Sequence, residues 1–441
     1  MSNSCAPRKR TSSIPETEME MSRSDKDRAK RLLYALAFLT DCTFGIAAPF
    51  YPPLATDEHG MSSTMIGIVF AAASTVSAIT CTTSGFVMRS FGRKFMISMG
   101  RTIQGIGLIL FGLLTFIEDD TLFTVSSLAL RVFQGVGSGT TLAATMATVA
   151  SLFQDNLDSV LATLQSCSAL GITLAPVIGY ILYQLGGFAL PFCLLGVGII
   201  CLGIWLNVAL PEHTTGYTEK AKLSNHPRGG MLADIRVIFA FFISFLAMFG
   251  VQYLNPVMST YIESSLDGDE IETVIGFFVV SFSFIGASIP VSKLSKGMKH
   301  RGSLLFVSLV LMGGSFVVLS GPRILPQSIL VVYCGVGLMG AACAFGVVPS
   351  LPEMVQAGAE KFPESKEDVN DVMSGFFGAS LCLGGIAGPI LSGILYDHYD
   401  FETGCWMVTF IFWATALIQL LSGTVQFETQ KDPLEDKLLP Q

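Results

Sequence analysis

Two ionisable side chains stand deep inside long apolar runs of this 441-residue sequence. Asp41 lies about nine residues into a run that begins near residue 32, and Arg131 lies about ten residues into a run that begins near residue 121. At the rise of an α-helix, both are roughly 14–15 Å from the start of their runs. An ionisable side chain in hydrocarbon costs at least ~2.5–3.5 kcal/mol, so each of the two is a candidate functional residue.

The chemistry open to these residues depends on their charge. Asp41 either exchanges a proton for an organic cation or sits in a polar helix interior without that role. Arg131 is expected to face a bundle interior and to find backbone carbonyls or an acid there, with Gln134 one turn along on the same face. A purely structural arginine is the alternative. Arg101 stands roughly 9 Å from the start of its run, so its long side chain can extend to the membrane interface, and we interpret it as a structural residue.

Two further polar residues, Asn255 and Glu353, lie next to prolines in the second half of the chain. Asn255 precedes Pro256 and can donate and accept hydrogen bonds but cannot titrate, so we expect it to orient a substrate. Glu353 either faces a central cavity as a second cation site or lies at the membrane interface. All five histidines fall in loops or at the ends of runs, which leaves proton binding to carboxylates.

The composition excludes several classes of protein. Hydrophobic residues make up 51% of the chain and charged residues only 14%, whereas a soluble domain carries about 25% charged residues. The net charge of −8 gives no argument for nucleic acid. We find no catalytic constellation, no phosphate-binding Gly-Lys-Ser/Thr motif and no zinc or disulfide spacing among the ten cysteines. We therefore predict a membrane protein that is not an enzyme and holds neither cofactor nor metal.

The elements that must position these residues are membrane-spanning helices. A span needs about 20 mostly apolar residues, and twelve runs of that kind predict an all-α membrane protein built from two six-helix halves. The runs are approximately 32–54, 64–88, 95–117, 121–150, 159–184, 188–210, 233–260, 273–294, 303–321, 328–351, 370–396 and 404–426. The predicted division is a disordered tail at 1–31, a bundle at 32–210, a central loop at 211–232, a bundle at 233–426 and a disordered tail at 427–441.

The distribution of basic residues predicts the orientation. Lys and Arg concentrate in the two tails, the central loop and the loops on the same side, while the opposite loops are rich in acids. The positive-inside rule therefore places both termini in the cytoplasm. The tail sequence Glu435 to Leu439 either acts as a dileucine sorting signal or simply contains two adjacent leucines.

The two halves share a pattern of glycines and prolines. The fifth and eleventh runs carry Pro176 and Pro389, each followed at the same spacing by a tyrosine, with an offset of 213 residues. Pro49 and Pro256 make a weaker pair in the first and seventh runs, for which chance similarity stays open. Six-helix repeats of this kind predict a binding site at the membrane midplane between the halves. The glycines expected to allow close helix packing there are Gly171, Gly179, Gly384, Gly388 and Gly393.

Three motifs resemble those of the major facilitator superfamily, from about residue 32 to residue 426. The segment from Arg131 to Gly139, which includes Gln134 and Gly135, resembles the RxxQGxGxG motif of proton-coupled antiporters. The segment from Gly171 to Tyr180 resembles the antiporter motif of the fifth helix. The superfamily's loop signature between the second and third helices is matched, except that an arginine replaces its usual acid. The matching residues are Gly85, Arg89, Gly92, Arg93 and Lys94.

Within the superfamily, the sequence resembles the vesicular amine transporters of solute carrier family 18, and most of all their B branch. The stretches that carry this resemblance are Pro49 to Pro52, Leu254 to Pro256 and Pro349 to Glu353. The chain departs from the amine transporters at three functional positions, because the acid before the helix 7 proline is Asn255, the helix 2 lysine falls near Ala73 and the helix 11 acid falls near Gly378.

The resemblance implies a major facilitator fold and a proton-coupled antiporter of small organic cations, such as amines or polyamines. Its partners would then be the cation, protons and the lipid bilayer, with the protein acting as a monomer in an intracellular vesicle rather than in the plasma membrane. The missing acids leave alternatives open: a facilitated uniporter, a sensor that does not transport, or an exporter of drug-like or neutral solutes.

Overall fold

The computed structural model describes residues 23–153, 157–209, 234–321, 328–362 and 366–425, and their regular elements are all helical. The first half contains α1 (Arg23–Gly45), α2 (Ala47–Pro53), the π-turn η1 (Leu54–Glu58), α3 (Ser63–Phe91), α4 (Arg93–Gly112), the 3₁₀ turn η2 (Leu113–Phe116), α5 (Asp120–Leu152), α6 (Leu157–Gly186) and α7 (Ala189–Ala209). The second half contains α9 (Ile235–Tyr253), α10 (Met258–Leu266), α11 (Glu270–Lys296), α12 (Gly302–Leu319), α13 (Ile329–Val347), α14 (Ser350–Lys361), α15 (Lys366–His398) and α16 (Phe401–Leu421).

Each of the twelve predicted runs forms a helix, so the predicted fold class is confirmed. Within the described residues, eleven helical segments are long and apolar enough to cross a membrane. The twelfth, α5, is 33 residues long, but Arg131, Gln134 and a series of glycines, serines and threonines lower its hydropathy. The first helix begins at Arg23, before the predicted boundary at residue 32. The central loop and the C-terminal tail, with its dileucine sequence, lie outside the described residues.

Three of the twelve spans are interrupted, and each interruption lies next to a proline. A proline has no N–H, so Pro49, Pro256 and Pro349 cannot bond to the carbonyl four residues before them. The first span breaks between α1 and α2, the seventh between α9 and α10, and the tenth between α13 and α14. At the seventh, the backbone N–H groups of Leu254 and Asn255 bond instead to carbonyls three residues earlier. The paired prolines of the first and seventh runs therefore bend corresponding helices.

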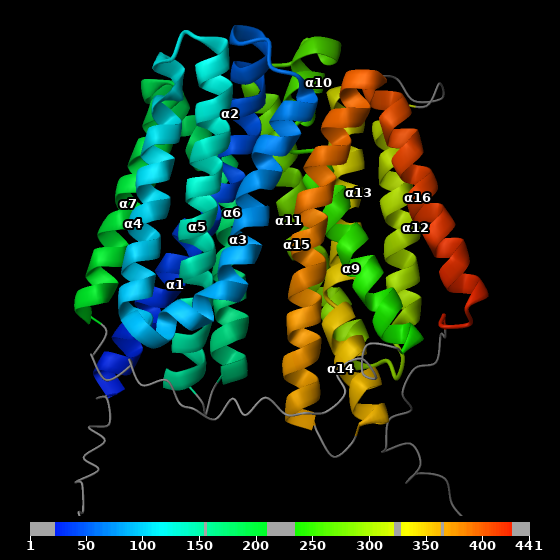
Figure 1. The fold of residues 1–441 in the computed structure, drawn as a ribbon. Coiled ribbons are helices and arrows are strands. Elements are labelled where there is room, and N and C mark those ends of the chain that lie inside the picture. The colour runs from blue at the N-terminus through cyan, green and yellow to red at the C-terminus, as the bar shows by residue number, and fades with distance from the viewer. Residues whose placement is uncertain (1–22, 154–156, 210–233, 322–327, 363–365, 426–441) are drawn as a thin grey trace, which may run out of the picture.

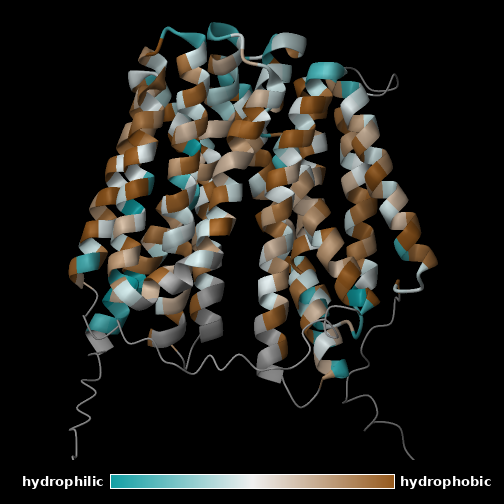
Figure 2. Ribbon diagram, in the orientation of Figure 1, coloured by the Kyte–Doolittle hydropathy of each residue, from teal (hydrophilic) through white to brown (hydrophobic). Residues whose placement is uncertain are grey.

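The helices form two bundles that stand side by side (Figure 1). We call the end at which α1 begins and α16 ends the tail side, and the opposite end, with α2, η1 and α10, the far side. The ribbons of the two bundles meet near the far side and separate toward the tail side (Figure 1). Hydrophobic residues dominate the length of the helices, and hydrophilic residues gather near their ends (Figure 2). This pattern is the one expected of helices surrounded by lipid.

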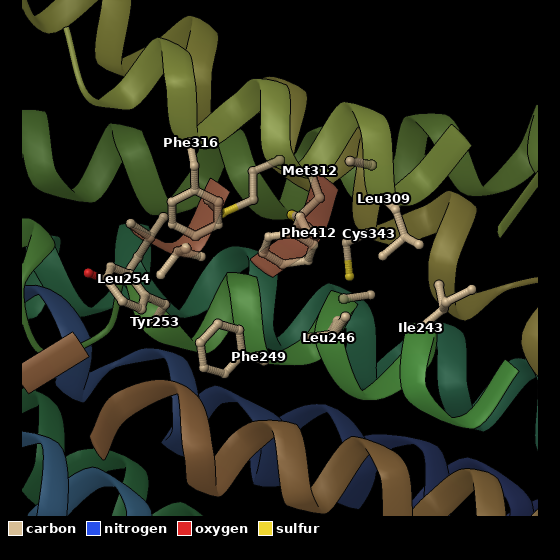
Figure 3. Packing of buried hydrophobic residues seen from close by; sticks show 14 of the residues in the cluster. Ile243, Leu246, Phe249, Tyr253, Leu254, Leu309, Met312, Phe316, Cys343 and Phe412 are labelled. Atoms are coloured by element: carbon tan, nitrogen blue, oxygen red, sulfur yellow. The ribbon is translucent and has the colours of Figure 1, made fainter. Parts of the chain in front are cut away.

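Aromatic and aliphatic side chains fill the core of the second bundle (Figure 3). Phe316 and Phe412 stack with ring centroids 5.7 Å apart, and the ring of Tyr253 meets Phe316 edge-on at 5.4 Å. Met312 and Leu309 extend this cluster along α12 (Figure 3). Contacts of this kind tie α9, α12 and α16 together, so the bundle is a packed unit of its own.

Glycines allow close backbone approach both inside the bundles and between them. A Cβ added at Gly171 would lie 2.3 Å from the carbonyl oxygen of Phe38 in α1, and one at Gly388 would lie 2.7 Å from that of Phe249 in α9. These contacts, like those of Gly179 and Gly384, lie within one half. Gly393 differs, because its added Cβ would lie 2.2 Å from the carbonyl oxygen of Ser63 in the other half.

Gly340 gives a test of packing inside a bundle. A Cβ added there would lie 2.0 Å from the carbonyl oxygen of Val280, which is backbone and cannot rotate away. We expect Gly340→Ala to lower the free energy of unfolding by about 1–3 kcal/mol, the usual cost of overpacking. Thermal unfolding in detergent would measure this. Gly375→Ala is the matched control, since nothing lies within 4 Å of its added Cβ; equal melting temperatures for the two variants would contradict the packing argument.

Candidate functional site

A cavity of about 310 Å³ lies between the two bundles. The first half contributes Asp41 and Arg131, while the second contributes Gln252 and Asn255. Most of the remaining wall is apolar. It includes Phe44, Ala48, Phe70, Ile172, Met248, Val251, Phe277, Val280 and Leu381. The structure therefore has a cavity between the halves, and Asp41 and Arg131, the two ionisable residues that the sequence analysis selected, line it.

The proline breaks form part of the cavity wall. Gly45 and Ala48 come from the break in the first span, and Leu254 and Asn255 come from the break in the seventh. Pro176 of α6 and Pro389 of α15 line the cavity as well. Interrupted helices expose backbone polar groups, which is tolerated in a membrane where the backbone lines a cavity.

Asp41 links the cavity to polar groups inside the first bundle. The side chain of Ser168 lies near its carboxyl group, and Arg101 acts on the carboxyl group electrostatically. Arg101 is buried, with 4% of its surface exposed, and its guanidinium donates to the amide oxygen of Gln104. The amide nitrogen of Gln104 in turn donates to the hydroxyl of Thr43, at 3.1 Å. Arg101, Gln104 and Thr43 are therefore joined by hydrogen bonds inside the first bundle, near Asp41.

The position expected for the Arg101 side chain was wrong, whereas its structural role stays a prediction. Its distance from the end of its run predicted a side chain extended to the membrane interface, but the guanidinium is buried inside the bundle and donates to Gln104. Inside the bundle the guanidinium has a hydrogen-bond acceptor in Gln104, and the negative charge of Asp41 acts on it at longer range. Depth along a helix could be estimated from sequence, but the direction in which the side chain points could not.

Arg131 is enclosed by aromatic rings rather than by the predicted carbonyls or acid. Its guanidinium carbon lies 4.3 Å from the ring centroid of Phe111 and 5.3 Å from that of Phe70. One guanidinium nitrogen donates to the side-chain oxygen of Gln134 at 3.3 Å, as the one-turn spacing predicted. Gln134 also donates to the carbonyl of Gly107. Nε and Nη2 of Arg131 are buried without a hydrogen-bond partner. The N–H groups of these two nitrogens are therefore available to donate hydrogen bonds.

In the second half, Asn255 and Glu353 occupy different places. Asn255 lines the cavity, and its side-chain nitrogen donates to Gln252 at 3.3 Å. Glu353 in α14 does not line it; its carboxylate accepts the backbone N–H of Arg301 at 2.9 Å and lies 3.9 Å from Arg236. With 2% of its surface exposed, Glu353 holds tail-side segments of the second bundle together. The structure gives it the place of a structural ion pair and not that of a cavity residue.

The loop signature lies at the junction of α3 and α4. Gly92 has φ of +77°, which favours glycine, and ends α3. Arg93 is buried at the start of α4, next to Lys94. The packing of Gly85 and the side chain of Arg89 lie outside what the structure describes. In α5, a Cβ added at Gly135 would lie 2.7 Å from the carbonyl oxygen of Ala73, so this motif glycine packs α5 against α3.

A second group of acids, which the sequence reasoning did not select, lies on the far side. Asp57 and Glu58 of η1 and Glu263 and Glu270 of α10 and α11 line a cavity of about 290 Å³ together with Tyr183. Burial, with the charges of Asp57 and Glu270, raises the pKa of Glu263 to about 7. A fall in pH on this side neutralises Glu263 and reduces repulsion between the halves. The acids are far apart in sequence, so only the fold shows that they meet.

Two six-helix bundles around a central cavity with a charged wall define a polytopic secondary transporter. Residues 33–364 match the family model described as Major Facilitator Superfamily. The mouse MFS-type transporter SLC18B1 is 30% identical over 86% of this chain and 81% of its own length, and the human synaptic vesicular amine transporter is 21% identical over 84% and 68%. A bacterial homologue of the lysosomal transporter Spinster superposes with a TM-score of 0.71 at 12% identity, covering 94% of this chain and all of that one.

The chain therefore belongs to the major facilitator superfamily, on its branch with the B-type members of solute carrier family 18. The family resemblance found in its motifs is confirmed. Among the described residues, no group of three His, Cys, Asp or Glu side chains is placed to hold a metal ion.

The elevated pKa of Glu263 predicts a specific dependence of stability on pH. The folded protein holds this proton up to a pH of about 7, whereas an unfolded glutamate loses it near pH 4.5. The penalty for the ionised carboxylate is therefore fully present above pH 7 and is relieved as pH falls toward 4.5. We expect Glu263→Gln to raise the melting temperature in lipid nanodiscs at pH 8 and to have a smaller effect at pH 5.5.

The exposed acid Glu118 provides the control, because Glu118→Gln removes a charge on the same side outside this cavity. An effect of Glu263→Gln that is the same at both pH values, or that is reproduced by Glu118→Gln, would contradict the assignment.

Proposed function

We propose that this protein is a proton-coupled antiporter that moves small organic cations, of the amine or polyamine class, by alternating access. The observation that carries the proposal is Asp41, a carboxylate in the wall of the central cavity at about mid-bilayer depth. It is an acidic group in an otherwise largely apolar cavity wall. The similarity to a vesicular amine transporter supports an amine as the cargo.

Exchange follows from competition for one carboxylate. A proton and an organic cation each neutralise Asp41, so the binding of one displaces the other. Arg101 and Ser168 stabilise the ionised carboxylate between these events. The apolar wall takes the hydrocarbon part of the cation, while Asn255 offers a hydrogen bond from the opposite half.

Arg131 contributes a fixed positive charge to the same cavity. Held between Phe70 and Phe111, it discourages a second cation from binding beside the first. Gln134 fixes its orientation. The free Nε and Nη2 donors can also hold water or a polar group of the cargo.

We further propose that the structure corresponds to the state open on the tail side. Close contacts between the halves lie at Ser63, Thr64 and Gly67, in the first turns of α3 on the far side, and in alternating access a transporter that is closed on one side opens on the other. With both termini in the cytoplasm, as the basic residues predict, the far side faces the lumen of an intracellular vesicle. An acidic lumen would neutralise Glu263 and favour this state.

The direct test is uptake of labelled spermidine by reconstituted protein in vesicles with an acidic interior. We expect uptake that an ionophore abolishes by collapsing the pH gradient. Asp41→Asn keeps the shape of the side chain and one of its acceptor oxygens but cannot bind a proton or pair with a cation, so exchange should fall at least about tenfold. Glu118→Gln, an exposed acid outside the cavity, should retain normal exchange.

The thermal unfolding of both variants shows whether each is folded. Full exchange by a folded Asp41→Asn protein would refute the role of Asp41, and uptake that ignores the ionophore would refute proton coupling.

A facilitated uniporter is the second candidate, and the second half of the cavity wall favours it. That half supplies the amides of Gln252 and Asn255 to the cavity but no ionisable carboxylate or basic side chain. Amides can hold a neutral polar solute as well as a cation. Uptake of a neutral solute without a pH gradient, and unchanged by Asp41→Asn, would support this alternative.

A further inference from the structure

The first turn of α3 is completed by a carboxylate from the other half of the protein. Asp397 lies in the last turn of α15 on the far side. Its Oδ1 accepts the backbone N–H of Ser63 at 2.8 Å, and its Oδ2 accepts that of Thr64 at 2.7 Å. Both donors belong to the start of α3, which lies 333 and 334 positions away in sequence. One carboxylate therefore bridges the two bundles through both of its oxygens.

This contact is favourable for two independent physical reasons. The first N–H groups of a helix have no partner within the helix, and the aligned peptide dipoles make that end positive. A carboxylate placed there accepts charge-assisted hydrogen bonds and neutralises part of the dipole. The side chain of Ser62 caps the same helix by accepting the N–H of Met65, so the cap of α3 is shared between its own half and Asp397.

The surroundings of Asp397 show that the contact depends on the relative position of the halves. A Cβ added at Gly393 would lie 2.2 Å from the carbonyl oxygen of Ser63, and one at Gly67 would lie 2.1 Å from that of Pro389. The backbones of α3 and α15 therefore meet directly beside the carboxylate. Any movement that opens the far side separates these backbones and breaks both hydrogen bonds.

We propose that Asp397 is a gate residue of the transport cycle, which stabilises the state closed on the far side by capping α3 across the two halves. The contact exists only when the far side is closed, so it shifts the equilibrium between the two states by its full free energy. The inference rests on alternating access by the proposed transporter, but not on the identity of the cargo or on proton coupling.

Asp400 provides a matched control three residues along the chain. Its Oδ1 accepts the backbone N–H of Thr403 at 2.9 Å and so caps α16. Both residues lie in the second half, and opening the far side leaves this cap intact. Asp397→Asn and Asp400→Asn make the same chemical change to the same kind of cap, and they differ in whether the cap joins the two halves.

The test measures the far-side distance directly. Spin labels are attached at Glu118→Cys and Ser265→Cys, two exposed far-side positions in opposite halves, in full-length protein that lacks the native cysteines and is reconstituted in nanodiscs. Double electron–electron resonance then gives the ratio of short to long distances. We expect Asp397→Asn to shift this ratio toward the long distance by about tenfold (~1.4 kcal/mol), and Asp400→Asn to leave it unchanged.

A second variant removes the donor instead of the acceptor. Proline is well tolerated at the first position of a helix, and the extended backbone of Ser62 suits the residue before a proline. Ser63→Pro therefore deletes one N–H donor with Asp397 still present, and it should shift the ratio in the same direction. It remains informative should Asp397→Asn fail to fold.

An unchanged ratio in both variants would overturn the proposal, and so would an equal shift in Asp400→Asn. The measurement needs no cargo and no pH gradient, so it can fail while the spermidine exchange assay succeeds, and the reverse. In the exchange assay, Asp397→Asn should slow uptake without changing its dependence on the pH gradient, because it alters the balance of states and not the cation site.

Discussion

A charge surrounded by lipid must be enclosed by polar or aromatic groups, and this constraint organises the first half of the protein. Asp41, Arg101 and Arg131 come from three different helices of that half. Arg101 donates a hydrogen bond to Gln104 and is attracted electrostatically by Asp41. Arg131 lies against two aromatic rings. These contacts join α1, α3, α4 and α5. Since exposing any of these charges to hydrocarbon would cost several kcal/mol, the half is expected to move as one body.

The second half satisfies the same constraint differently. Its core near the cavity is built from rings and aliphatic side chains such as Phe249, Phe316 and Phe412, and it places amides in the cavity wall (Figure 3). Its buried charges lie on the tail side, where Glu353 meets two arginines. The first half therefore carries the charged residues of the cavity, and the second half supplies a largely apolar wall opposite them. In the motion that we propose, this wall moves across the site without exposing a charge.

The sequence predicted the fold well because the bilayer leaves few alternatives: twelve apolar runs can only be helices. It also selected Asp41 and Arg131, since an ionisable residue within an apolar run is conspicuous. The sequence did not show in which direction a side chain points from its helix. Arg101 was assigned to the interface because helical rise gives depth but not the face of the helix, and Glu353 was left undecided for the same reason. The far-side acids and the contact of Asp397 with α3 join residues that only folding brings together.

The distribution of strong and weak contacts explains how such a protein can switch. Contacts within a half include packed rings, enclosed charges and glycine-mediated helix pairs, and each half keeps them in the rocking motion that we propose. Contacts between the halves decide which state is populated, and two states of similar stability require that they sum to only a few kcal/mol. A bidentate cap on one helix end and the repulsion of a few acids have that magnitude. In the transport cycle that we propose, the far side combines an attraction from Asp397 with a repulsion around Glu263, and the balance between the two sets the population of the closed state.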